Sequence, residues 1–235
     1  MPTPLLSVAA LVRSRPWCLL LPRRSLLIVI GWVTSVALAS SLGLTDTMLA
    51  RIVDTYGNSA KSRVLKWQRL VDENMHATDT IKLEVVNKFF NDYRFLSDAK
   101  HWHKEDYWAT PIEFIGTKGG DCEDFAIAKY ITLRALNIPD QRLRITYVTA
   151  LHLNQAHMVL TYYPTPKTVP LVLDNIDQRI LPANQRDDLK PLYSFNADGL
   201  WLAKMRGEGR RVGSADDLDM WKDFVVRLED ERGTL

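Results

Sequence analysis

A run of apolar residues from Phe125 to Leu136 covers most of the helical wheel. This pattern is typical of a buried helix rather than of a helix that lies on the surface. Gly119 and Gly120 come shortly before it, and two glycines free the backbone to turn sharply into the helix. We therefore expect the rest of the chain to pack around this helix, whose first turn contains Cys122.

Helical patterns also precede this run. Three segments are predicted to be packing helices: 45–56, 59–75 and 80–90. In the second of them, apolar residues recur at intervals of four and three, which places them on one face. Residues 110–113 form a capping box with proline at the first helical position, a strong signal for a further, short helix. The polar and aromatic segment 91–107 is predicted to form irregular surface.

Strand patterns follow the buried helix. Apolar and polar side chains alternate over 142–149, and further strands are predicted at 156–163 and 169–174. Short links between consecutive strands favour an antiparallel sheet. Because the helices come first and the sheet second, the chain is predicted to have an α+β fold. Segment 193–204 is expected to add strands at the edge of the sheet.

The N-terminal region has the pattern of a secretory signal. Arg23 and Arg24 precede an uncharged run of 21 residues, Ser25 to Thr45, which contains the small-residue step Ala37-Leu38-Ala39. A positive flank, an apolar run and an Ala-x-Ala step predict export, with cleavage after Ala39. An uncut run of this length could also anchor the chain in a membrane. In both cases we expect the folded part to face away from the cytosol.

The leader defines the first of three predicted regions. We expect a signal peptide over 1–39, the main domain over 40–205, and a charged linker with a C-terminal helix over 206–235. The leader carries four arginines and no acidic residue, so that 26 of the 30 basic residues and all 28 acidic residues belong to the rest of the chain. The mild basicity of the chain therefore comes from the leader, and we expect no nucleic-acid partner.

Cys122 lies where a helix begins. The unpaired backbone N–H groups of a helix N-terminus carry partial positive charge, which favours thiolate over thiol. The same N–H groups are able to bind an oxyanion. Since Cys18 lies in the leader, Cys122 is the only thiol of the predicted mature chain. In an oxidising compartment, such a thiol is either buried and inert or reactive for a purpose.

Three acidic residues flank this thiol: Asp121, Glu123 and Asp124. Acidic residues suit a helix start, so N-capping by Asp121 and interaction with the helix dipole explain them without any further function. Anions that crowd a nucleophilic thiolate nevertheless raise its pKa and reduce its reactivity. A bound cation removes this conflict, and carboxylate oxygens suit calcium better than zinc. The spacing is not that of an EF-hand loop, so the residues alone leave the metal open.

Two residues on the predicted strands are candidate partners of the cysteine. A cysteine nucleophile needs a base within hydrogen-bond reach and a third group that orients the base. His157 lies on the second predicted strand, and Asp174 ends the third. If these strands are antiparallel neighbours beside the cysteine helix, the three side chains can converge as a catalytic triad. His152 and Asp177 are nearby competitors, and the spacing alone leaves the choice open.

The motifs around these residues resemble a known family, the bacterial transglutaminase-like cysteine proteinases of the LapG type. The resemblance rests on five motifs: DYWATP at 106–111, GGDCED at 119–124, AHMVL at 156–160, LDN at 173–175 and YSFN at 193–196. It covers most of the chain, from about residue 60 to about residue 205. Several motifs in one order are far more specific than a single cysteine and a single histidine.

The resemblance implies a papain-like, transglutaminase-type fold of the α+β class. It further implies that Cys122 is the nucleophile, that His157 is the general base and acid, and that Asp174 orients His157. It also implies Ca²⁺ as a cofactor, held by the acidic residues beside the nucleophile: Asp121, Glu123 and Asp124.

Substrate and partner are implied by the resemblance alone. Family members are periplasmic proteases that cut large, outer-membrane-associated biofilm adhesins near their N-terminal end, beside paired alanines, and so release them. A membrane-bound cyclic-di-GMP receptor of the LapD type sequesters these proteases when that second messenger is abundant. We therefore expect an adhesin as substrate, an inner-membrane receptor of this type as partner, and the periplasm as the location.

Two other functions remain open at this point. One keeps the fold but changes the reaction to that of a transglutaminase or deamidase, which acts on glutamine side chains of proteins. The other is a non-catalytic binding module, tethered to the membrane by an uncut leader. Peptide-bond cleavage, cross-linking and ammonia loss change the product mass differently, and a Cys122 that does not react with thiol reagents would favour the binding module.

Overall fold

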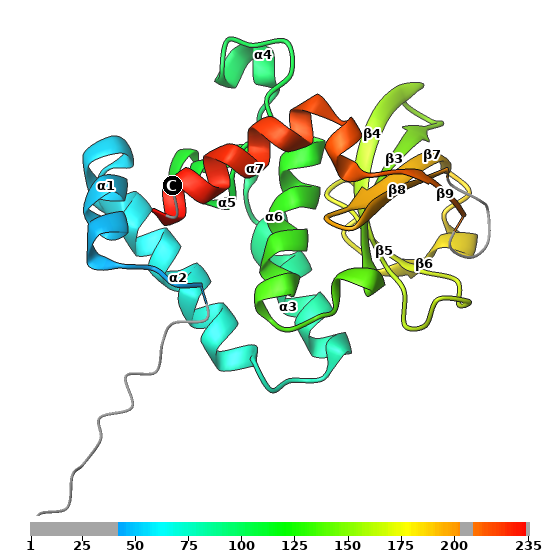
Figure 1. Cartoon of the computed structure of the whole chain (residues 1–235), viewed down its shortest axis with the longest axis horizontal. Coiled ribbons are helices and arrows are strands. Elements are labelled where there is room, and N and C mark those ends of the chain that lie inside the picture. The colour runs from blue at the N-terminus through cyan, green and yellow to red at the C-terminus, as the bar shows by residue number, and fades with distance from the viewer. Residues whose placement is uncertain (1–41, 203–208, 234–235) are drawn as a thin grey trace, which may run out of the picture. The chain divides into compact units, whose positions relative to one another are not determined.

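A computed structural model describes residues 42–202 and 209–233 of the chain. The predicted signal peptide, its cleavage site and the first residues of the predicted linker lie outside the described residues. Figure 1 shows the early helices and the β-sheet on opposite sides of the buried helix, α6 (Cys122–Ala135). Within the two described ranges, no helix is both long and apolar enough to cross a membrane.

Three helices open the described part of the chain: α1 (Asp46–Tyr56), α2 (Asn58–Asn74) and α3 (Asp79–Asn91). They confirm the three helical patterns seen in the sequence. The hydroxyl of Thr45 caps α1, because it accepts a hydrogen bond from the backbone N–H of Met48 at 3.2 Å. The indole N–H of Trp67 on α2 donates to the hydroxyl of Thr132 on α6 at 2.8 Å. The second helix therefore packs directly against the buried one.

The turn into α6 depends on glycine. The predicted capping box begins α5 (Pro111–Thr117), and the chain then forms a short parallel ladder between β1 (Arg94–Phe95) and β2 (Gly119–Gly120). Gly119 has a φ of +154°, and a β-carbon added there would lie 2.1 Å from the backbone oxygen of Arg94. Only glycine fits such a close approach of two backbones. This ladder sets the position at which α6 begins.

The helix α6 is buried along most of its length, as its apolar pattern predicts. Its fully or almost fully buried side chains include Phe125, Ile127, Tyr130 and Leu133. It packs against α3 on one side and against the sheet on the other. The same helix also buries Lys129, whose exposed fraction is 1%.

Seven strands form one antiparallel sheet in the order β6-β5-β4-β3-β7-β8-β9. Their bounds are β3 (Leu143–Ala150), β4 (Gln155–Tyr162), β5 (Leu171–Leu173), β6 (Leu181–Pro182), β7 (Leu189–Asn196), β8 (Gly199–Leu202) and β9 (Arg210–Gly213). The three predicted strands correspond to β3, β4 and β5, and their antiparallel pairing confirms the α+β fold class. In this pairing Leu160 of β4 lies opposite Leu173 of β5, so Asp174, the residue after β5, lies beside the strand that carries His157.

The later strands differ from the sequence-based expectation. β7 lies inside the sheet, between β3 and β8, and not at the edge. Its pairing joins residues as distant in sequence as Ile145 and Phe195, which a local alternation of side chains does not reveal. The edge strand on this side is β9, which lies in the segment that we interpreted as a linker; there Arg211 pairs with Trp201 of β8.

The C-terminal helix α7 (Asp219–Arg232) packs against the buried helix α6 and the sheet. Its Trp221 is buried and contacts the rings of Tyr130 on α6 and Phe195 on β7. A short 3-10 turn, η3 (Ala215–Asp217), precedes this helix, and the side chain of Ser214 caps that turn. The remaining short elements are α4 (Asp98–His101), η1 (Asp140–Arg142) and η2 (Ala183–Gln185).

Candidate active site

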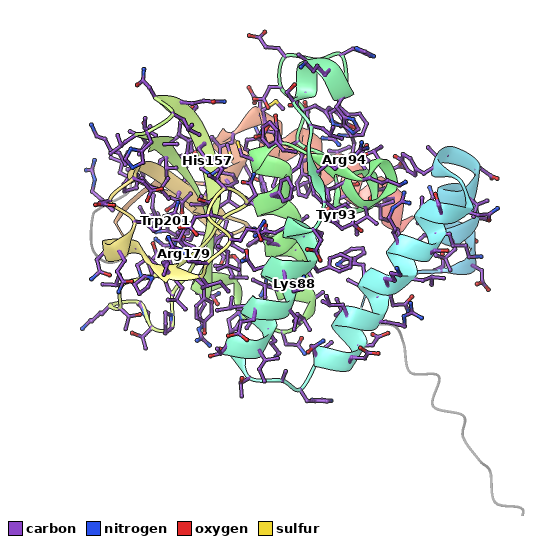
Figure 2. The ribbon with its side chains drawn as sticks, turned by 180° about the vertical axis from the view of Figure 1, so that it is seen from behind. Lys88, Tyr93, Arg94, His157, Arg179 and Trp201 are labelled. Atoms are coloured by element: carbon purple, nitrogen blue, oxygen red, sulfur yellow. The ribbon has the colours of Figure 1, made fainter. Side chains whose placement is uncertain are left out.

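The packing of α6 against β4 brings Cys122 and His157 to one pocket. Cys122 is the first residue of α6, and His157 lies near the start of β4. Figure 2 shows His157 on the sheet, beside α6. The pocket has a volume of about 950 Å³ and is lined by Asp98, Lys104, Glu105, Asp106, Trp108, Asp121, Cys122, Glu123, Tyr147, Gln155, Ala156, His157 and Met158.

Asp174, which directly follows β5, holds the ring of His157. Nε2 of His157 and Oδ1 of Asp174 are 2.8 Å apart, and both side chains are buried. Burial raises the pKa of Asp174, but hydrogen bonds from His157, from the N–H of Ile176 and from Arg186 outweigh it and hold the pKa below its usual range. Asp174 is therefore an ionised acceptor for Nε2, and Nδ1 is the ring nitrogen that remains for proton exchange with a thiol.

The thiol of Cys122 has an acidic partner. Its Sγ donates to Oε2 of Glu123 at 3.1 Å. Burial raises the pKa of Cys122, and the charges of Glu123 and Asp121 raise it further, while the backbone N–H of Met158 acts in the opposite direction. The positive end of the helix dipole is therefore outweighed by burial and by the neighbouring acids. A reactive thiolate at this position needs additional positive charge.

The acidic side chains form a cluster at the start of α6. Ligand oxygens lie within 4.8 Å of one another in two all-carboxylate groups: Asp98, Asp121 and Asp124, and Asp98, Asp106 and Glu123. Burial, with the neighbouring Asp121 as a second cause, raises the pKa of Glu123 to about 10 and that of Asp98 to about 6. Burial also raises the pKa of Asp124. So many buried carboxyl groups are unfavourable in ionised form unless a cation compensates them.

The donor atoms of this cluster fit calcium. They are carboxylate oxygens, which calcium prefers as ligands. Oδ1 of Asp98 and Oδ1 of Asp121 are buried and have no hydrogen-bond partner within the described part of the chain. Such oxygens cost free energy unless something binds them. Asp124 differs, because its oxygens accept the backbone N–H groups of Ala109 at 2.6 Å and of Asp121 at 3.2 Å.

Two members of the cluster, Asp98 and Asp106, were missed from the sequence, which predicted segment 91–107 to be irregular surface. Asp98 is only 3% exposed, and its Oδ2 accepts the backbone N–H of Tyr107 at 2.5 Å. No fixed spacing relates it to Asp121, because the two are brought together by the β1–β2 ladder. The only local signal was the position of Asp106 in one of the family motifs.

The competing residues do not join the site. His152 is exposed in the turn between β3 and β4, and Asp177 forms an ion pair with Arg179 at 2.7 Å. Among the described residues, none of the groups with metal-ligand geometry contains a histidine.

The family described as "Bacterial transglutaminase-like cysteine proteinase" matches residues 59–190, a segment that contains all the predicted site residues. No curated protein sequence matches the chain.

Solved structures of LapG also resemble this chain. LapG of Legionella pneumophila, in an EGTA-treated form, is 44% identical over 79% of this chain and 98% of its own, with a TM-score of 0.70. The calcium-bound form of that protein is 46% identical over 79% of this chain and 100% of its own, with a TM-score of 0.68. The matched region of this chain therefore resembles nearly the whole LapG chain in both sequence and fold.

Proposed function

This chain belongs to the bacterial transglutaminase-like cysteine proteinases, and we propose that it is an exported, calcium-dependent endopeptidase whose nucleophile is Cys122. We assign the role of general base and acid to His157, and the orientation of His157 to Asp174. The observation that carries this proposal is the 2.8 Å hydrogen bond between His157 and Asp174, at a pocket that also contains Cys122. A cysteine nucleophile requires such an oriented base.

Acylation follows from this arrangement. The thiol proton of Cys122 moves to Nδ1 of His157, and the thiolate attacks the carbonyl carbon of the scissile peptide bond. The carbonyl oxygen becomes an oxyanion, which backbone N–H groups at the start of α6 can stabilise. His157 then donates its proton to the leaving amine, the C–N bond breaks, and the acyl group remains on Sγ as a thioester. Asp174 stabilises the transient imidazolium because it stays ionised.

Deacylation uses the same groups in reverse. His157 accepts a proton from a water molecule, whose oxygen attacks the thioester carbonyl. The C–S bond breaks, the new carboxyl end of the substrate leaves, and Sγ recovers its proton from His157. Water is thus the only co-reactant, and the net reaction is hydrolysis of one peptide bond.

We propose that Asp121, Glu123 and Asp124, with Asp98 in addition, hold the calcium ion. When bound, the ion supplies positive charge that compensates the clustered carboxylates. Glu123 links this site to the nucleophile, because its Oε2 accepts the thiol hydrogen of Cys122. If Glu123 were a ligand of the ion, its Oε2 would be a weaker acceptor for this hydrogen, and the thiol proton of Cys122 would be available to His157. The calcium-bound LapG structure of Legionella pneumophila supports this proposal.

We further propose the substrate and the partner from the family resemblance. The substrate is a large surface adhesin, cut near its N-terminal end beside paired alanines, and its release promotes biofilm dispersal. A LapD-type cyclic-di-GMP receptor in the inner membrane sequesters the protease. The secretory pattern of the leader supports the periplasm as the place of this reaction.

Intact-mass analysis tests the reaction class. Purified protein from Ser40 onward is incubated with an adhesin N-terminal fragment that contains paired alanines, once with calcium and once with a chelator. We expect one discrete cut that requires calcium, with product masses that add up to substrate plus one water. Cross-linked products or a deamidated substrate would instead assign acyl-transfer chemistry. An unchanged substrate, from protein shown to be folded and calcium-loaded, would contradict the proposal.

A further inference from the structure

We infer that Arg186 is a positioning residue of this active site, which fixes the orientation of the Asp174 carboxylate and thereby that of the His157 ring. The inference rests on the catalytic roles proposed above for His157 and Asp174. Arg186 lies outside the family motifs quoted above, in the polar segment between the predicted strand 169–174 and segment 193–204. In the fold it lies between η2 and β7, and it is 3% exposed.

The two oxygens of Asp174 have separate partners. Nη2 of Arg186 donates to Oδ2 at 2.7 Å, whereas the ring of His157 is bonded to Oδ1 at 2.8 Å. Oδ1 also accepts the backbone N–H of Ile176 at 3.0 Å, so a rotation of the carboxylate disturbs the hydrogen bonds of both oxygens at once. The side chains of Arg186 and Asp174 are 2% and 0% exposed, so bulk water does not compete for these oxygens. Charge-assisted hydrogen bonds in such surroundings are strong and directional.

Asp188 holds the guanidinium group in turn. It accepts from Nε of Arg186 at Oδ1 and from Nη2 at Oδ2, both at 2.8 Å. A bidentate pair fixes the plane of a guanidinium group, which a single contact does not. The backbone oxygen of Asp188 also accepts the N–H of Leu151 at 2.8 Å, which ties this segment to the turn between β3 and β4. The hydrogen bonds thus run from Asp188 through Arg186 and Asp174 to His157.

The backbone of Asp174 is anchored without Arg186. Its carbonyl oxygen accepts hydrogen bonds from Asn91 of α3 at 2.8 Å and from Lys129 of α6 at 3.1 Å. The place of Asp174 in the fold is therefore set by other residues, and Arg186 adds control of the carboxylate. A buried ion pair is by itself a weak source of stability. Nη1 of Arg186 is moreover buried without a hydrogen-bond partner among the described residues, which costs further free energy.

Arg186 is also the more constant of the two cationic side chains beside Asp174. Burial lowers the pKa of Lys129 to about 7, so its charge varies near neutral pH. Burial acts in the same direction on Arg186, but the bonds to Asp188 and Asp174 outweigh it and raise its pKa. The positive charge that faces Asp174 is therefore always present at Arg186.

Steady-state kinetics provide the first test. We expect Arg186→Met to lower kcat for adhesin cleavage about 10- to 100-fold, the value of a charge-assisted hydrogen bond. KM should stay within about twofold, because Arg186 does not line the pocket. Arg186→Lys keeps the charge and should recover part of kcat. The matched control is Arg179→Met, at a position labelled in Figure 2. It removes a bidentate pair with Asp177, but the Arg179 side chain is exposed, so this variant should keep wild-type kcat.

The histidine tautomer provides a readout that needs no cleavage. In ¹⁵N-histidine-labelled Cys122→Ala protein, with His157→Gln used for assignment, we expect the ring of His157 to carry its neutral-state proton on Nε2. Adding Arg186→Met should replace this signature by a mixture of tautomers. If the protein shows this effect but cuts no adhesin, the proposed function fails and the inference stands.

The opposite outcome overturns the inference alone. Suppose that the wild type cuts the adhesin and that Arg186→Met has a kcat within twofold of the wild-type value. If the Nε2–H signal of His157 is also unchanged in Arg186→Met, Arg186 does not position Asp174. If Arg186→Met does not fold, Arg186→Gln and Asp188→Asn take its place, since the first removes the charge and the second releases the guanidinium plane. Wild-type kcat and ring signals in both would equally overturn it.

Discussion

The helix N-terminus and the acidic cluster have opposite effects on the pKa of the Cys122 thiol. The dipole of α6 favours the thiolate, whereas burial and then the charges of Glu123 and Asp121 raise the pKa of the thiol. A cation on the same carboxylates shifts this balance toward the thiolate. The residues that weaken the nucleophile are thus the residues through which calcium would control it.

Glu123 allows a direct test of this coupling. We expect Glu123→Gln to lower calcium affinity at least about tenfold, because the number of charged ligands sets the affinity of such sites. Isothermal titration calorimetry measures the change. Glu105→Gln is the matched control, since Glu105 lines the same pocket but belongs to none of the groups with metal-ligand geometry among the described residues. An unchanged affinity in Glu123→Gln would exclude it as a ligand.

The short strand β2 is the element that places the start of α6 relative to β1. We expect Gly119→Ala to lower the thermal midpoint of unfolding and the cleavage activity, because its β-carbon would meet the backbone oxygen of Arg94 at 2.1 Å. Gly57→Ala is the control: Gly57 also has a positive φ, +83°, but a β-carbon there has no neighbour within 4 Å. Differential scanning calorimetry of both variants separates the steric conflict from the cost of a positive φ. Equal losses in the two would contradict the packing argument.

Helix α7 contacts the segment that leads into the active site. Arg227 forms an ion pair with Glu113 at 2.8 Å and donates to the backbone oxygen of Trp108, which lines the pocket, at 2.7 Å. Glu231 accepts the hydroxyl hydrogen of Thr110 at 2.6 Å. The C-terminal helix therefore supports one wall of the pocket. The boundary that the sequence suggested between the main domain (40–205) and the C-terminal region (206–235) stays a prediction.

Glu231 makes this contact dependent on pH. Burial raises the pKa of Glu231 to about 7. The hydrogen bond from Thr110 lowers this pKa, whereas the negative charge of Glu113 raises it further. Because the folded-state pKa lies above the usual value of 4.5, the stability that Glu231 contributes is complete below pH 4.5 and is lost as the pH rises through 7.

We therefore expect Glu231→Gln, which cannot ionise, to raise the thermal midpoint by about 2–4 °C at pH 8.5, equivalent to about 1 kcal/mol. At pH 5 the gain should disappear. The exposed Asp223 lies on the same helix, so Asp223→Asn serves as the control. A pH-independent gain in Glu231→Gln would contradict the assigned titration.

The elements with local signals were predictable, and those made by distant pairing were not. The caps at Thr45 and Thr110 and the apolar periods of α2 and α6 are encoded within a few residues each. The interior position of β7 and the approach of Asp98 to Asp121 depend on ladders between segments far apart in the chain. The role of Arg186 could not be predicted from the sequence for the same reason. Arg186 lies in an irregular segment, and its partner Asp174 is 12 positions away.

In the whole molecule, the site draws on both sides of α6. The candidate base comes from the sheet, the candidate nucleophile from α6, and Asp98 from the α4 segment. A ligand that binds only the folded arrangement stabilises the entire domain. We expect calcium at a hundredfold excess over its Kd to stabilise the protein by about 2.7 kcal/mol, measured as a rise in thermal midpoint that a chelator reverses. An unchanged midpoint would argue against a calcium site in the folded protein.

The central claim is that Cys122 carries out peptide-bond hydrolysis. The most direct test is the rate of adhesin-fragment cleavage by wild-type protein and by Cys122→Ala, each with matched circular dichroism and calcium loading. We predict that the substitution lowers kcat by at least about 10⁴-fold, because removal of a nucleophile abolishes the covalent route. Undiminished cleavage by Cys122→Ala would contradict the assignment of Cys122 as the nucleophile and the mechanism built on it.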